Sequence, residues 1–114
     1  MTTTISSFVR ETQLTASATT LFNTSTSEIK FIGKFTLTNT SDNNAEATIW
    51  LLNSSTSETT GSGGNWVIRR TVPAGETITI NELQGQVLNK SMKVSGLAAT
   101  ASVINVNISG TVQT

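Results

Sequence analysis

The chain has 114 residues, no formal net charge and only 12% charged residues, which fits one domain and argues against a broad nucleic-acid-binding face. It contains no cysteine and no histidine, so disulfides, His or Cys catalytic pairs and the usual zinc sites are excluded. No apolar run is long enough to span a bilayer, and the first residues lack the pattern of a secretory signal. We therefore expect no cofactor, no metal, no membrane partner and no nucleic-acid partner.

Uncharged polar residues dominate the composition: 22 Thr, 14 Ser and 10 Asn. Thr, Val and Ile together supply 39 residues, and side chains branched at Cβ favour strands over helices. The composition predicts an all-β protein.

The first 27 residues are rich in Thr and Ser and show no helical period. We interpret them as an extended N-terminal arm with strands around residues 6–13 and 20–23, separate from a sandwich domain over residues 28–114. Ile5, Phe8 and Leu14 would anchor this arm on a neighbouring subunit. The alternative is that the stretch around Phe8 is an edge strand of the sandwich itself.

Residues 28–39 and 45–53 alternate apolar and polar side chains, which is typical of half-buried strands. In the first run the alternation places Phe31, Phe35 and Leu37 on the buried face and Ile32 on the other face. The residues between the runs, 40–44, form a polar turn cluster. The sequence therefore predicts that the two strands form a hairpin.

Further strands are predicted at residues 66–72, 77–81, 91–97 and 103–112. Residues 54–65 form a low-complexity loop, and Val72 to Gly75 has the Pro and Gly positions of a type I turn. Residues 82–90 carry a helix-like pattern, but Gly85 limits it to one turn at most.

Seven or eight short strands separated by regular turn signals predict an antiparallel, jelly-roll-like β-sandwich. Its core is expected to contain Phe31, Phe35, Leu37, Ile49, Leu51, Ile78, Ile80, Val94, Ile104, Val106 and Ile108.

The sequence predicts neither a catalytic site nor a phosphate-binding loop. The glycines between Gly61 and Gly64 lack the following Lys-Ser/Thr of a phosphate loop and are interpreted as a hairpin loop. Glu76 and Glu82 flank a strand, but no other catalytic group accompanies them. We expect no enzyme activity.

The aromatic and arginine residues are better candidates for contacts between subunits. Trp50 alternates with inward residues and should face away from the core, where an exposed tryptophan meets a partner. Trp66 is compatible with core packing, an interface or stacking on a sugar. Adjacent arginines on a strand point to opposite faces, so one of the pair at 69 and 70 could join subunits. The predicted interface residues are Phe8, Trp50, Trp66, Arg69 and Arg70.

Residues 34–53 and 72–114 carry a series of strand and turn signatures. They run through Leu37-Thr-Asn-Thr-Ser41, Val72-Pro-Ala-Gly-Glu-Thr77, Gly85-Gln-Val-Leu88, a strand over 93–97 and Val103-Ile-Asn-Val-Asn-Ile-Ser-Gly110. This pattern resembles the small β-sandwich virion proteins of tailed bacteriophages, which serve as capsid decoration (cement) proteins or as head and tail accessory modules.

The resemblance implies a non-enzymatic structural protein on the virion, most simply a cement protein that self-associates and stabilises the head. Its partners would be the major capsid protein or other virion proteins and further copies of itself, as a trimer. The alternative is a tail or head-fibre module that binds host-surface glycans through Trp66 and the Asn- and Thr-rich loops.

Overall fold

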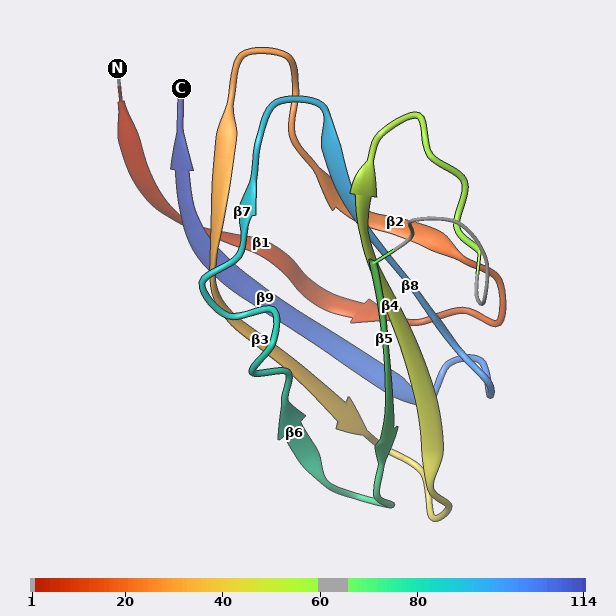
Figure 1. The fold of residues 1–114 in the computed structure, drawn as a ribbon. Helices are drawn as coiled ribbons and strands as arrows, with labels where there is room; N and C mark the ends of the chain where they lie inside the picture. The colour runs from red at the N-terminus through yellow and green to blue at the C-terminus, as the bar shows by residue number, and fades with distance from the viewer. Residues whose placement is uncertain (1, 60–65) are drawn as a thin grey trace.

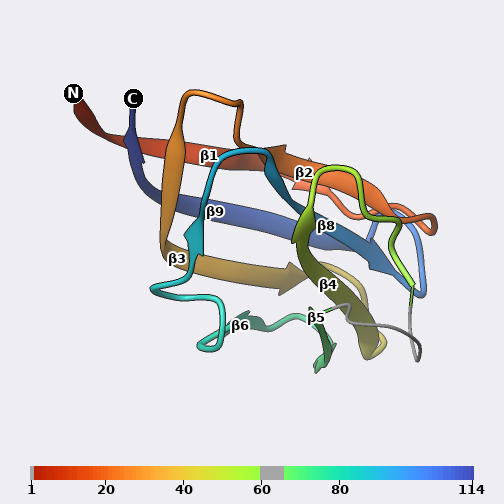
Figure 2. The ribbon, with the colours of Figure 1, turned by 45° about the horizontal axis from the view of Figure 1, so that its top comes forward.

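The computed structural model describes residues 2–59 and 66–114, in which nine strands form two antiparallel sheets packed face to face (Figures 1 and 2). The strands are β1 (Thr3–Gln13), β2 (Thr19–Asn23), β3 (Ile29–Asn39), β4 (Ala45–Asn53), β5 (Trp66–Val72), β6 (Thr77–Thr79), β7 (Val87–Leu88), β8 (Met92–Ala98) and β9 (Ile104–Gln113).

Sheet A has the order β1-β9-β3-β6, with the short β7 also paired to β3, and sheet B has the order β2-β8-β4-β5. These interleaved orders are those of a jelly roll, in which the chain passes repeatedly from one sheet to the other. The successive strands that stay within one sheet are β4 with β5 and β6 with β7. The predicted all-β sandwich is confirmed.

The predicted hairpin between β3 and β4 is wrong. β3 pairs with β9, β6 and β7 in sheet A, whereas β4 pairs with β5 and β8 in sheet B. The crossing sets the core-facing side chains of β3 and β4 opposite each other across the sandwich. In a hairpin the same side chains would lie side by side in one sheet. Alternation alone therefore cannot distinguish a hairpin from a crossing between sheets.

A fully buried asparagine shapes this crossing. The side-chain amide of Asn39 donates to the carbonyl oxygens of Asn43 at 2.7 Å and of Val72 at 2.9 Å. Its Oδ1 atom accepts from the backbone N–H and the hydroxyl of Ser41, at 2.9 and 2.8 Å. The buried amide is thus satisfied on both sides, and it ties the turn at 40–44 to the end of β5.

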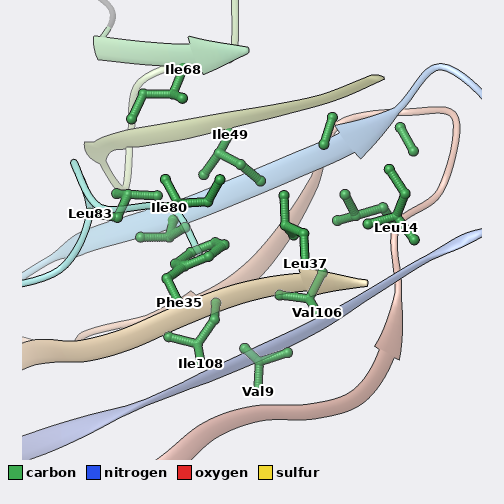
Figure 3. Packing of buried hydrophobic residues seen from close by; sticks show 14 of the residues in the cluster. Val9, Leu14, Phe35, Leu37, Ile49, Ile68, Ile80, Leu83, Val106 and Ile108 are labelled. Atoms are coloured by element: carbon green, nitrogen blue, oxygen red, sulfur yellow. The ribbon is translucent and has the colours of Figure 1, made fainter. Parts of the chain in front are cut away.

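Side chains from both sheets meet in a single core, which Figure 3 shows with Phe35, Leu37, Val106 and Ile108 facing Ile49 and Ile68. Eight of the predicted core residues are at most 1% exposed: Phe35, Leu37, Ile49, Ile80, Val94, Ile104, Val106 and Ile108. Leu51 and Ile78 pack against this cluster while partly buried.

The placement of Phe31 in the core is wrong: it is 45% exposed, while its neighbour Ile32 is fully buried. The register between β3 and β9 shifts between Ile32 and Lys34. A β-bulge of this kind adds one residue and reverses the alternation. The predicted stripe is therefore correct from Phe35 onward, but every side chain before Gly33 points to the opposite face.

The N-terminal segment is built into the sandwich rather than extended as an arm. β1 pairs with β9 along its whole length and forms one edge of sheet A, and β2 pairs with β8 at the edge of sheet B. Leu14, predicted as an anchor on a neighbour, is 1% exposed in the protein's own core. The edge-strand alternative describes these residues correctly.

The first turn after β5 differs from its predicted form in detail. The N–H of Glu76 donates to the carbonyl of Pro73 at 3.1 Å, and Gly75 has φ of 72°. The turn therefore lies one residue later than predicted, with Gly at the position where a type II turn needs positive φ. Residues 81–85 form successive short turns that bury Leu83, in agreement with the expected failure to build a longer helix.

Candidate interaction surface

The outer face of sheet A carries exposed apolar side chains aligned across its strands. Ile5 of β1 pairs with Thr111 of β9, Thr111 pairs with Phe31 of β3, and Phe31 pairs with Val87 of β7. Directly paired residues share a face of the sheet. Ile5, Phe31 and Val87 are 88%, 45% and 40% exposed, and we refer to these three side chains as the apolar row.

The bulge is the reason that Phe31 belongs to this row. Gly110 of β9 lies so close to β3 that a Cβ atom at this position would collide with the carbonyl oxygen of Phe31. Gly33 lies nearby, and a Cβ atom added there would be 3.3 Å from the carbonyl oxygen of Ser109. Two glycines facing each other across the strands thus permit the close backbone approach that turns Phe31 outward.

A surface hollow of about 420 Å³ lies along the row, lined by Thr3, Ile29, Phe31, Val87, Thr111 and Gln113. Its lining combines three apolar side chains with two hydroxyls and one amide and contains no charged group. Such a surface suits an uncharged partner that covers the apolar side chains and offers hydrogen bonds at the rim.

The same face becomes polar beyond the bulge. A smaller hollow of about 240 Å³ is lined by Lys34, Thr36, Asn107 and Ser109. Sheet A therefore presents an apolar half next to β7 and the start of β1, and a polar half that follows the bulge.

Phe8, a predicted interface residue, packs within the molecule instead. Its ring stacks on that of Phe22 with centroids 5.1 Å apart, and the Nζ atom of Lys30 lies 5.3 Å from the Phe8 centroid. The same ammonium donates to the carbonyl of Asn23 at 2.7 Å. This cation–π contact joins β1, β2 and β3 at one end of the sandwich.

Trp50 faces away from the main core, as its alternation predicts, but the chain itself covers it. It is 2% exposed, and its indole N–H donates to the carbonyl of Thr59 at 2.9 Å. The Nζ atom of neighbouring Lys93 pairs with Glu58 at 2.8 Å. The segment after β4 thus folds over sheet B, so the expectation of an open tryptophan for a partner is wrong.

The remaining predicted interface residues lie on the edge strand β5. Trp66 is 38% exposed and Arg69 is exposed. Their register partners on β4 place Arg69 and Arg70 on opposite faces, as expected. Arg70 forms an ion pair with Glu82, so this arginine is engaged within the chain, and the structure does not bring Trp66 or Arg69 near the apolar row.

The two glutamates considered for catalysis have separate environments. Glu82 is paired with Arg70, whereas Glu76 is exposed in the turn before β6. In residues 2–59 and 66–114 there is no group of three or more acidic, His or Cys residues that could hold a metal ion. The glycines at 61–64 lie outside the described residues.

Sequence reasoning identifies Ile5 as a contact residue but misses Phe31 and Val87. The available signal is the single glycine within each of the two strands, because an isolated glycine in a strand often marks a bulge. Finding which strands lie next to each other requires the fold.

Comparison with known protein families, characterised proteins and solved structures reveals no match to this chain. Within the described residues there is no helix long and apolar enough to cross a membrane.

Proposed function

We propose that the chain is a non-enzymatic structural protein of a tailed-phage virion, and that it decorates the capsid by docking sheet A on coat subunits. The observation that carries this proposal is the apolar row, three large side chains held in register on one rigid face. A decoration protein needs such a surface and a stable scaffold behind it, and it needs no reactive group.

The energetics favour a docking role for the row. Covering a large aliphatic or aromatic side chain contributes about 1.5–3 kcal/mol when it starts fully exposed. The three residues begin between 40% and 88% exposed, so together they supply a few kcal/mol. That amount only partly offsets the cost of association, so firm attachment would draw on copies that are joined to one another and bind the particle together.

The surface composition supports the same role. With 12% charged residues and no net charge, closely packed copies accumulate little mutual repulsion. The resemblance of residues 34–53 and 72–114 to phage virion proteins points in the same direction.

The test is co-sedimentation with particles of a phage that encodes the chain. The unaltered protein should band with intact particles, and Phe31→Ser combined with Val87→Ser should reduce its occupancy at least about tenfold, because two desolvated anchors are lost. Trp66→Ser is the matched control, since it removes a half-exposed aromatic from another edge and should leave occupancy unchanged. Absence of the protein from particles, or equal loss for both variants, would contradict the proposal.

Glycan binding by a fibre module is the second candidate. The exposed ring of Phe31 beside Thr3, Thr111 and Gln113 combines an apolar face with hydroxyl and amide groups, which is the mixture a sugar ring needs. Trp66 offers another exposed aromatic at the start of β5. Binding to a glycan array that Phe31→Ala or Trp66→Ala abolishes, with no attachment to heads, would favour this role over decoration.

A further inference from the structure

The free edge of sheet A is formed by β1, and its backbone hydrogen bonds can be assigned. Thr2 and Thr114 exchange both of their backbone bonds, at 3.2 and 3.0 Å. In an antiparallel pair, doubly bonded residues alternate with residues whose N–H and C=O groups point away from the partner strand. From the register of β1 on β9, Thr4 and Ser6 bond to β9, so Thr3, Ile5 and Ser7 direct their backbone groups to the open edge.

This edge has little protection against pairing with another strand. β1 is 11 residues long, and its part from Thr3 to Val9 contains no charge and no proline. The first register shift comes only after Ser7. In natural proteins, charges, prolines, bulges or short length normally prevent an edge strand from pairing with another chain.

The other edges of the sandwich carry such protection. β6 and β7 have three and two residues, and β2 has five residues with a register shift. β5 presents Arg69 and Arg70. The contrast singles out β1 as the strand that accepts a partner.

We propose that two copies of the chain pair through β1, antiparallel about a two-fold axis at Ile5. Ile5 then lies opposite Ile5 of the second copy, and Thr3 lies opposite Ser7 of that copy. Each of these pairs exchanges two backbone bonds, about six in total, since all of the residues involved direct their N–H and C=O groups outward. This inference does not depend on the virion role.

A second copy is the occupant that the sequence of this edge favours. The paired segment is uncharged, so a two-fold axis brings no like charges together. Thr and Ile have high strand propensity, and the pairing partly covers Ile5, which is 88% exposed in the single chain. A two-fold contact is closed, because both copies use the same edge, and so it gives a dimer rather than a fibre.

Pairing would also extend the surface described above. Directly opposed residues share a face, so the apolar row of one copy would continue through the two Ile5 side chains into the row of the other. The dimer would join two copies of the five-stranded sheet A and double the apolar strip available to a larger partner. The proposed unit of self-association is thus a dimer, whereas the sequence led us to expect a trimer.

The first experiment measures the mass of the full chain by sedimentation equilibrium across the micromolar range. The unaltered protein should approach twice its 12.0 kDa mass as concentration rises. Ile5→Lys places a charge at the two-fold axis and should return the mass to that of a monomer. Ile5→Pro should do the same while keeping the pairing of β1 with β9, because the N–H that proline removes is one that points outward.

Thr71→Lys is the matched control, since Thr71 is an exposed residue of the other long edge, β5, and its charge should leave the dimer intact. Far-ultraviolet circular dichroism and the melting temperature establish that each variant is folded.

A second experiment traps the contact directly. The chain has no cysteine, so Ile5→Cys introduces a single thiol. Doubly bonded antiparallel residues have Cα atoms about 5.5 Å apart, within the range for a disulfide. Mild oxidation should give a covalent dimer at least about tenfold faster than it does for Thr71→Cys. A chain that is monomeric at every concentration, or a dimer insensitive to both Ile5 variants, would overturn the inference, and particle binding by a monomer would leave the proposed function standing.

Discussion

Phe31 and Phe35 are four residues apart on one strand and have opposite roles. Phe35 is fully buried between the sheets, whereas Phe31 is 45% exposed in the apolar row. The two share residue type and strand and differ only in the side of the bulge on which they lie. Substituting each phenylalanine in turn therefore distinguishes an effect on the stability of the fold from an effect on binding.

Phe35→Ala should lower the free energy of unfolding by about 3–5 kcal/mol, because it empties a fully enclosed site in the core. Phe31→Ala should change it by about 1 kcal/mol or less, since the ring is already half in water. Urea denaturation of both variants measures the difference. Equal destabilisation would mean that the bulge does not turn Phe31 outward.

Within β3, the bulge decides which face of the strand each side chain occupies. Gly110 permits it, because the carbonyl of Phe31 occupies the space that a side chain at position 110 would need. A backbone oxygen cannot move aside as a flexible side chain can, so any larger residue must push β3 and β9 apart.

Gly110→Ala should therefore destabilise the protein by about 1–3 kcal/mol and raise hydrogen exchange at residues 31–33. Gly33→Ala provides the comparison. Its closest neighbour would be 3.3 Å away, which a small shift can relieve, so its effect should be clearly smaller. If Gly110→Ala were tolerated as well as Gly33→Ala, the close approach of the strands would not hold the bulge.

The N-terminal strands form an edge of each sheet in the molecule. β1 pairs with β9 along its length, and β2 pairs with β8. Phe8 and Phe22 stack between these two strands under the ammonium of Lys30. The N-terminal segment thus contributes ladder hydrogen bonds, core side chains and the closure of one end of the sandwich.

Deletion of residues 1–12 should unfold the chain or lower its melting temperature by more than about 10 °C. The deletion removes most of β1, leaves β9 with an unpaired edge and removes Val9 from the core. Thermal unfolding followed by circular dichroism tests this, with Ile5→Ser as the control for loss of surface alone. A truncated chain that melts like the intact one would restore the interpretation of residues 1–27 as an arm.

The class of fold and most of the strands follow from local patterns in the sequence. β4 and β5 occupy the predicted residues 45–53 and 66–72, because alternation and turn residues are local signals that need no knowledge of neighbours. The inward stripe through Phe35, Val106 and Ile108 followed from the same period of two.

Which strands are adjacent is set by contacts between distant parts of the chain, and the candidate surface depends on that adjacency. The apolar row combines Ile5, Phe31 and Val87, which are far apart along the chain and meet because β1, β9, β3 and β7 lie in one sheet. The crossing after Asn39, the bulge at Gly33 and the burial of Trp50 by the segment after β4 likewise depend on contacts between distant residues. Periodicity gives each strand two faces, but what covers a face is set by the rest of the chain.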